Sequence, residues 1–256
     1  MSPEPVLLSY DLHGNGAPVI FLHGFPFNRH IWDDLIPYLS PYIQMILPDL
    51  RGFGHSPASE DVLSMELLAE DIYHLMDHLG LERAALVGHS MGGYVALAFA
   101  HLYSQRLTGL ALVASHADPD PPARREARYF TVAQIRERGI LPLLEDMPPR
   151  LTPNPTVQEK VRRFIQACSP QTAIYALLGM AERADANLWL REINVPVLIV
   201  TGSADPLIES ARIQAMLEQI PVASWVELPG IGHMPMLEAP AALARALLGW
   251  VQQFQG

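Results

Sequence analysis

The stretch Ala84-Ala85-Leu86-Val87-Gly88-His89-Ser90-Met91-Gly92-Gly93 decides the fold of this chain. A short apolar run ends abruptly in Gly-x-Ser-x-Gly, and small apolar residues that favour a helix follow, from Tyr94 to Ala100. This order predicts a strand, a sharp turn and a helix, with Ser90 at the turn. A serine hydroxyl is a poor nucleophile until a base assists it, and such a turn lifts the hydroxyl clear of the sheet. Ser90 is therefore the candidate nucleophile.

The two glycines that flank this serine are a physical requirement of the turn. The turn strains the serine backbone and brings strand and helix close together, so that a side chain at Gly88 or Gly92 would clash. A glycine-rich turn without any catalytic role is the alternative interpretation. The strand before the motif, the helix after it and an acid and a histidine downstream all favour catalysis.

Composition bounds the class of protein. The chain has 256 residues, of which 50% are hydrophobic and 17% charged, which predicts one large folded domain, alone or with an insertion. The net charge of -10 argues against nucleic acid or an anionic membrane as a partner. No run approaches the ~20 apolar residues of a membrane span, and no signal-peptide pattern appears. We expect a soluble, cytoplasmic protein, a monomer or homodimer, whose partner is a small molecule.

Apolar runs alternate with helical patterns along the chain, which predicts an α/β fold with a mostly parallel sheet and helices on both faces. The expected strands span residues 19–22, 43–47, 84–87, 107–114, 195–201 and 223–228. The expected helices span residues 29–39, 65–79, 91–100, 207–219 and 241–254.

Residues 118–193 break this alternation, because they contain proline-rich turns and helical patterns but no strand pattern. We expect an all-helical cap there, inserted between two parts of the core, residues 1–117 and 194–256. Within the cap, the stretch from Arg124 to Arg138 interleaves arginines with glutamates, which is typical of a solvated helical face.

A serine nucleophile needs a general base, and the base needs an acid that orients it. Asp205 lies on the short loop after the strand expected at 195–201, at the edge where ligands bind in open α/β sheets. Capping of a helix that begins at Pro206 is the structural alternative for this residue. We predict that Asp205 is the acid.

The base must be one of ten histidines. His233 follows the last strand on a glycine-rich loop, from which it can reach inward, whereas His74 and His78 lie on an expected helix and His13 in an expected turn. His23 and His89 lie inside tight motifs, where we expect backbone-bracing or packing roles. Ser90, Asp205 and His233 follow one of the chain orders in which this triad recurs. We expect no metal, because no group has zinc-like spacing, and no cofactor.

A tetrahedral intermediate also needs hydrogen-bond donors for its oxyanion. The N–H of Met91, directly after the nucleophile, is one candidate. The second is the N–H of Phe25, in the segment Leu22-His23-Gly24-Phe25-Pro26 that follows an early strand. A simple strand-terminating turn is the alternative for that segment.

Together these motifs resemble the α/β-hydrolase family over essentially the whole chain, and the resemblance is closest to capped carboxylesterases and 3-oxoadipate enol-lactonase-like enzymes. The motifs that carry it include His23-Gly24-Phe25-Pro26, Asp49-Leu50-Arg51-Gly52-Phe53-Gly54-His55-Ser56, Gly88-His89-Ser90-Met91-Gly92, Gly179-Met180-Ala181-Glu182-Arg183, Gly202-Ser203-Ala204-Asp205 and Gly232-His233-Met234-Pro235-Met236-Leu237-Glu238. Haloalkane dehalogenases and epoxide hydrolases of this fold use an aspartate where this chain has Ser90, so both are disfavoured.

The resemblance implies a serine hydrolase that cleaves small, mainly apolar carboxylic esters through an acyl-enzyme. We expect a largely apolar pocket with Phe25, Met91, Leu207 and Met234 near its floor. A lactonase, a cofactor-free perhydrolase and a non-hydrolytic small-molecule-binding protein are the alternatives, because a fold does not dictate one function.

Overall fold

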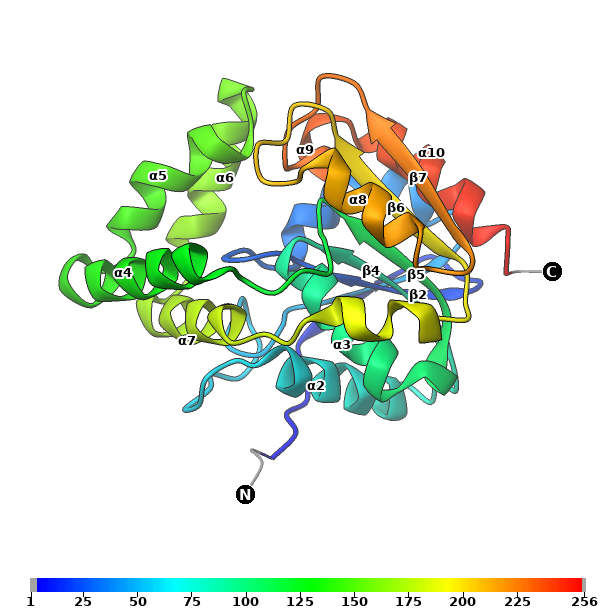
Figure 1. Cartoon of the computed structure of the whole chain (residues 1–256). Helices are drawn as coiled ribbons and strands as arrows, with labels where there is room; N and C mark the ends of the chain where they lie inside the picture. The colour runs from blue at the N-terminus through cyan, green and yellow to red at the C-terminus, as the bar shows by residue number, and fades with distance from the viewer. Residues whose placement is uncertain (1–3, 255–256) are drawn as a thin grey trace.

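The structure is a computed structural model that describes residues 4–254. Its core is one seven-stranded sheet in the order β1-β3-β2-β4-β5-β6-β7 (Figure 1). β1 runs antiparallel to β3, and every other neighbouring pair is parallel. The strands are β1 (Tyr10–His13), β2 (Pro18–Leu22), β3 (Gln44–Pro48), β4 (Ala84–His89), β5 (Leu107–Val113), β6 (Val197–Gly202) and β7 (Ala223–Leu228). The predicted α/β fold is confirmed.

Helices cover both faces of this sheet. α2 (Met65–His78) and α3 (Met91–Leu102) pack together on one face, and α10 (Pro240–Val251) packs with the segment of η1 (Arg29–Leu35) and α1 (Ile36–Leu39) on the other (Figure 1). Parallel strands between two helical layers are buried on both sides, which explains why β4 and β5 are mostly apolar and almost fully buried. The short elements η2 (Ser104–Arg106), α8 (Ser210–Leu217) and α9 (Pro235–Glu238) complete the core.

Three expectations about the elements need correction. β1 was not expected, because it is a four-residue edge strand with polar residues, and His13 ends this strand instead of lying in a turn. The helix expected at 29–39 is a 3-10 helix over Arg29–Leu35 and an α-helix only from Ile36. At the junction Pro37 has no N–H, and the carbonyl of Asp33 accepts from Ile36 N–H instead, which is the 3-10 pattern. The helix expected at 207–219 begins only at Ser210.

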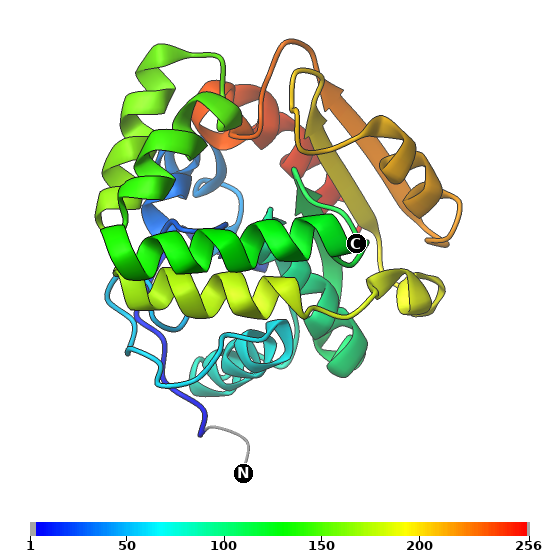
Figure 2. The same ribbon diagram turned by 60° about the vertical axis from the view of Figure 1, so that its left-hand side comes forward.

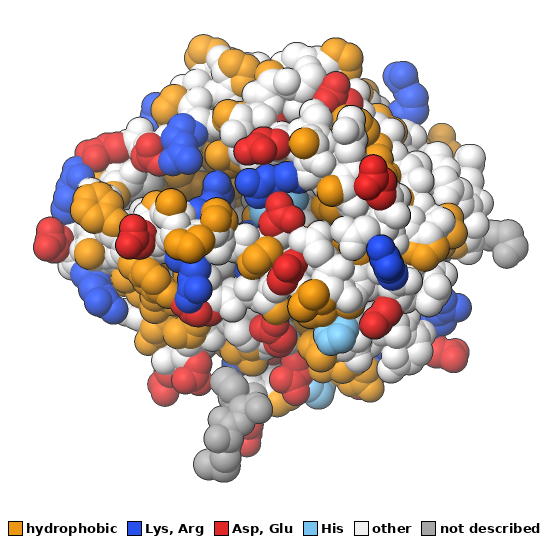
Figure 3. All heavy atoms as spheres, viewed as in Figure 1, with side chains coloured by type: hydrophobic (Ala, Val, Ile, Leu, Met, Phe, Trp, Pro, Cys, Tyr) orange, Lys and Arg blue, Asp and Glu red, His pale blue; other side chains and the backbone are white. Residues whose placement is uncertain are grey.

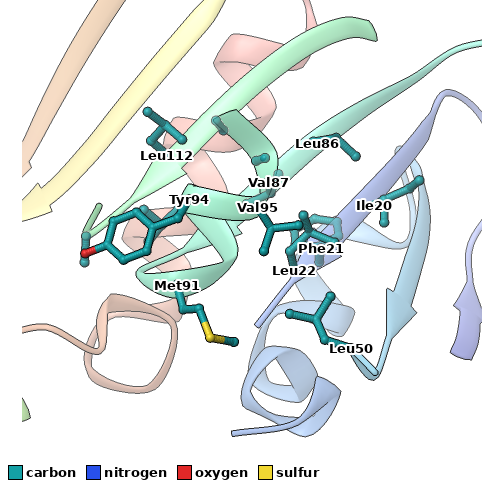
Figure 4. Close-up of a cluster of buried hydrophobic side chains, with 14 of the residues drawn as sticks. Ile20, Phe21, Leu22, Leu50, Leu86, Val87, Met91, Tyr94, Val95 and Leu112 are labelled. Carbon is teal, nitrogen blue, oxygen red and sulfur yellow. The ribbon is translucent and has the colours of Figure 1, made fainter. Parts of the chain in front are cut away.

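The turn after β4 has the strained serine that the motif predicts. Ser90 has φ 50° and ψ −112°, and α3 begins at the next residue. Hydrogen bonds hold this conformation: Ser90 N–H donates to the carbonyl of Val113 (3.0 Å), and Ser90 C=O accepts from Ser115 Oγ (2.8 Å). Figure 4 shows the buried side chains packed around the turn, among them Leu22, Val87 and Met91. The backbone of Ser90, the nucleophile candidate, is therefore held by hydrogen bonds and by the packed core around it.

Replacing Gly92 by alanine should destabilise this turn. A Cβ atom there would lie 2.3 Å from the carbonyl oxygen of Leu22, a backbone atom that cannot swing aside. We expect a loss of about 1–3 kcal/mol or more in the free energy of unfolding, measured by urea denaturation, together with loss of activity. Gly249→Ala is the matched control, because its Cβ would meet nothing within 4 Å in an exposed helix position, so it should leave stability equal or higher. Equal stability of the two variants would contradict the packing argument.

Four helices between β5 and β6 form a separate group, which we call the four-helix segment: α4 (Pro122–Arg138), α5 (Leu141–Leu151), α6 (Pro155–Gln166) and α7 (Pro170–Ala181). α4 runs beside α7 and α5 beside α6, beyond one end of the sheet (Figure 2). The 3-10 helix η3 (Ala186–Glu192) then leads back to the core. Within residues 4–254, this connection contains no strand, and no helix has the length and apolarity to cross a membrane.

Candidate functional site

The three residues predicted as nucleophile, acid and base come together at one edge of the sheet. Ser90 follows β4, Asp205 follows β6 and His233 follows β7, so all three lie beyond the carboxyl ends of parallel strands. Ser90 Oγ donates to His233 Nε2 (3.0 Å), and His233 Nδ1 donates to Asp205 Oδ2 (2.7 Å). Side chains up to 143 positions apart in sequence thus form one hydrogen-bonded chain.

The two hydrogen-bond partners of His233 determine which tautomer its imidazole adopts. The Asp205 side chain is fully buried and can only accept hydrogen bonds when ionised, which assigns the proton to Nδ1 and leaves Nε2 free to accept from Ser90. The second carboxylate oxygen, Oδ1, accepts from Leu207 N–H (2.8 Å). Asp205 therefore shapes its own loop, but it does not cap a helix at Pro206, because α8 begins four residues later.

The loop that carries His233 is held in place by the carboxylate of Glu238, a residue to which the sequence motifs give no role. Glu238 Oε2 accepts from Gly232 N–H and Glu238 Oε1 accepts from Met234 N–H, each at 3.1 Å. The two amides flanking His233 are thus held by one side chain. A glutamate five residues after the histidine, at the end of a short helix, is the sequence signal that could have revealed this clamp.

The peptide groups of His233 itself also have partners. Its N–H donates to the carbonyl of Leu151 (2.7 Å), the last residue of α5, and its C=O accepts from His89 Nε2 (2.9 Å). His23 Nε2 likewise accepts from Leu50 N–H (3.0 Å). The bracing roles predicted for His23 and His89 are confirmed, and the bond to Leu151 ties His233 to the four-helix segment.

Three buried histidines stay neutral in the folded protein. Burial lowers the pKa of His23 to about 4, against an ordinary value of 6.5. Burial and the nearby Arg183 and Arg212 lower the pKa of His116 to about 3. Burial and the neighbouring His233 lower the pKa of His89 as well. In the unfolded chain all three bind a proton below pH 6.5, whereas the folded chain excludes it.

Stability should therefore fall as the pH drops from 7.5 to 5. The unfolded state binds more protons in this window, so each buried histidine reduces the free energy of unfolding by about 1–2 kcal/mol. His116→Gln should make the pH dependence shallower by one such increment, measured by urea denaturation at both pH values. His78→Gln, on an exposed helix position, should keep the wild-type dependence. An unchanged pH dependence in His116→Gln would count against the argument.

The two backbone amides predicted to hold an oxyanion lie after neighbouring strands. Phe25 follows β2 and Met91 follows Ser90 after β4, and these strands pair directly, with Leu22 beside Gly88. Neither N–H donates a hydrogen bond to any residue in the described range 4–254. The Met91 amide also lies at the N-terminus of α3, where the helix dipole favours negative charge.

A cleft of about 650 Å³ opens between the core and the four-helix segment. Phe25 and Leu207 line it, whereas Met91 and Met234 are fully buried and do not. Four arginines and two acids also line this cleft, so it differs from the apolar pocket expected from the sequence: they are Arg124, Arg128, Arg138, Arg150, Glu145 and Asp146. Figure 3 shows the surface hollowed above α4, with Lys and Arg side chains at the rim.

The arginine-rich part of α4 is therefore not only a solvated face. Arg124 and Arg128 are one helical turn apart, so their side chains leave the same face of α4, and that face borders the cleft. The interleaved glutamates at 126 and 137 lie on exposed positions. The sequence pattern showed which residues share a face, but not what the face is packed against.

Comparison with known proteins agrees with the observed fold. The model of the alpha/beta hydrolase family matches residues 19–246. A thermophilic esterase from Thermogutta terrifontis is 37% identical and superposes with a TM-score of 0.94, covering 97% of this chain and 94% of the other. A 3-oxoadipate enol-lactonase from Acinetobacter baylyi is 26% identical over 99% of this chain and 96% of its own length. A pimeloyl-[acyl-carrier protein] methyl ester esterase from Vibrio vulnificus is 27% identical over 95% and 99%.

The family model spans most of the chain, and the similarity extends over nearly the full length of each relative. The described sheet, the strained serine after β4 and the order Ser90, Asp205, His233 are consistent with that match. This chain belongs to the alpha/beta hydrolase family.

Proposed function

We propose that this protein is a serine carboxylesterase with the triad Ser90, His233 and Asp205. The observation that carries the proposal is the hydrogen-bonded chain from Ser90 Oγ through the imidazole to the buried carboxylate. Ser90 is partly exposed while its two partners are buried, so a substrate can reach the hydroxyl and water cannot easily compete for the imidazole.

Each group has a defined task in the proposed two-step reaction. His233 Nε2 takes the proton of Ser90 as the hydroxyl oxygen attacks the ester carbonyl, and Asp205 stabilises the resulting imidazolium. The amides of Phe25 and Met91 donate to the oxyanion. His233 then returns the proton to the departing alcohol. In the second step His233 activates a water molecule, which releases the acid and regenerates Ser90.

We also propose that the chain is divided into a core and a cap. Residues 1–117 and 194–256 form the core that holds the triad, and residues 118–193 form a helical cap over it. The bond from His233 N–H to Leu151 C=O supports this division, because it joins the base to the end of α5. The cleft between cap and core is then the substrate entrance.

A lactonase is the second candidate, and the similarity to an enol-lactonase over nearly the whole chain favours it. The same residues would serve, since a lactone is an internal ester and its alcohol simply stays attached to the acyl-enzyme. Turnover of a lactone compared with its linear ester analogue separates the two activities.

The experiment that tests ester hydrolysis is a p-nitrophenyl ester series from acetate to laurate, followed by mass spectrometry after a fluorophosphonate probe. We expect a labelled Ser90 peptide and rapid turnover of the shorter esters, within ~1–10³ per second. Labelling with turnover of lactones alone would favour the lactonase.

Peroxide-dependent turnover in carboxylic acid buffer tests the perhydrolase alternative. Recovery of a bound ligand intact, without turnover, tests the binding-protein alternative. Absence of labelling would overturn the triad assignment.

A further inference from the structure

The buried carboxylate of Asp120, two residues before the start of α4, is surrounded by three arginines. The Asp120 side chain is fully buried, and it accepts hydrogen bonds from Arg128 Nε and from Arg183 (2.5 Å). Arg124 Nε lies 3.6 Å from the same carboxylate. Burial alone would raise the pKa of Asp120, but the arginines more than offset it, so the pKa lies below its ordinary value. One negative charge therefore faces three positive charges.

Arg124 is the member of this group whose charge is left least compensated. Its guanidinium makes no hydrogen bond to any side chain or carbonyl within residues 4–254, whereas Arg128 and Arg183 both bond to Asp120. Burial above all, together with the neighbouring Arg128 and Arg183, lowers the pKa of Arg124 below its ordinary value. Most of the donors of Arg124 remain available, and its side chain is 41% exposed.

The other arginines of the cleft are already neutralised by acids of their own. Arg138 pairs with Glu145 at 2.7 Å and Arg150 pairs with Asp146 at 2.5 Å. The excess positive charge of the cleft wall is thus concentrated at Arg124, since the neighbouring Arg128 already bonds to Asp120. The chain as a whole has a net charge of -10 and therefore repels anions, so this part of the cleft wall is a local exception.

We propose that Arg124, with Arg128 beside it, binds a carboxylate of the substrate, so that the natural substrate is an ester or lactone that also bears a free carboxylate. The N–H of Leu207 bonds to Asp205. Phe25 follows β2, which pairs with the strand that ends before Ser90. Both side chains line the same cleft as Arg124, so one molecule can extend from Arg124 toward the triad. A single uncompensated guanidinium fits a planar monoanion, which it can bind through two parallel hydrogen bonds. The inference names the substrate class and rests on the proposed ester hydrolysis for the reaction itself.

The test compares two esters that differ only at the far end of the acyl chain: p-nitrophenyl hydrogen adipate, which ends in a carboxylate, and p-nitrophenyl hexanoate, which ends in a methyl group. Wild type should have the higher kcat/KM for the adipate. In Arg124→Gln the ratio of the two kcat/KM values should fall about 10- to 100-fold, mostly through KM, since a charge-assisted hydrogen bond is lost. Arg124→Lys should recover part of the ratio.

Arg163→Gln is the matched control. Arg163 lies on α6 with a 75% exposed side chain, it is not among the residues that line the cleft, and the substitution removes the same charge. It should leave the ratio of the two esters at the wild-type value. An equal ratio in wild type and Arg124→Gln would overturn the carboxylate site.

Binding of adipate itself, measured by titration calorimetry, gives a readout that does not depend on hydrolysis. Adipate should bind wild type and bind Arg124→Gln at least tenfold more weakly. If Arg124-dependent binding persists while neither ester is hydrolysed and Ser90 is not labelled, the carboxylate site stands and the proposed esterase function falls. If the hexanoate is hydrolysed and adipate binds both proteins equally, the esterase stands and the carboxylate site falls.

Discussion

Ser90→Ala should lower kcat for p-nitrophenyl esters by about 10⁵–10⁶-fold. The variant loses the atom that forms the acyl-enzyme in the proposed reaction, so the imidazole and the proposed oxyanion donors can only assist a direct attack by water. The protein should stay folded, because alanine is smaller than serine and the hydroxyl makes only the hydrogen bond to His233. Steady-state kinetics measure the loss, and mass spectrometry should find no fluorophosphonate on the variant.

Ser104→Ala is the control for this measurement. Ser104 is an exposed serine in η2, near the end of α3 that lies away from Ser90, so its replacement should change neither kcat nor labelling. A Ser90→Ala variant with more than one hundredth of the wild-type rate would show that another residue forms the covalent intermediate. Its circular dichroism and urea midpoint, compared with wild type, separate a chemical loss from unfolding.

Asp205→Asn should lower kcat by about 10⁴-fold while the fold is retained. The amide can present N–H to His233 Nδ1, which favours the other imidazole tautomer, with the proton on Nε2. A protonated Nε2 cannot accept the proton of Ser90, although the three side chains keep their places. The amide oxygen can still accept from Leu207 N–H, so the loop should keep its shape.

The pH dependence of kcat gives this prediction a readout that a packing defect would not change. In Asp205→Asn the imidazole holds its proton on Nε2 and accepts poorly from Ser90. Hydroxide then becomes the more effective base, so the rate should keep rising with pH into the alkaline range. Asp77→Asn, which alters an exposed ion pair with Arg106 near the C-terminal end of α2, is the control and should keep the wild-type profile. A loss of less than tenfold in Asp205→Asn would assign the orienting role to another group.

Local features of the sequence were sufficient for the elements around the site. Gly88 and Gly92 predict the tight turn because no larger residue fits beside the backbone, and the structure places both at close backbone contacts. Apolar runs between turn residues predict the strands because both faces of a parallel sheet are buried. The edge strand β1 was not predicted, because its residues are only partly buried and do not form an apolar run.

The sequence by itself determined which residues stand at the ends of the strands, and therefore that Ser90, Asp205 and His233 lie at one edge of the sheet. Only the tertiary structure decided what surrounds them: the Glu238 clamp, the bond from His233 to the end of α5, and the direction in which Arg124 points. Strand and helix periodicities are local properties of the chain, so they fix which side chains share a face. The partner of a face depends on how distant segments pack, and no local pattern encodes the excess charge that this packing leaves in the cleft.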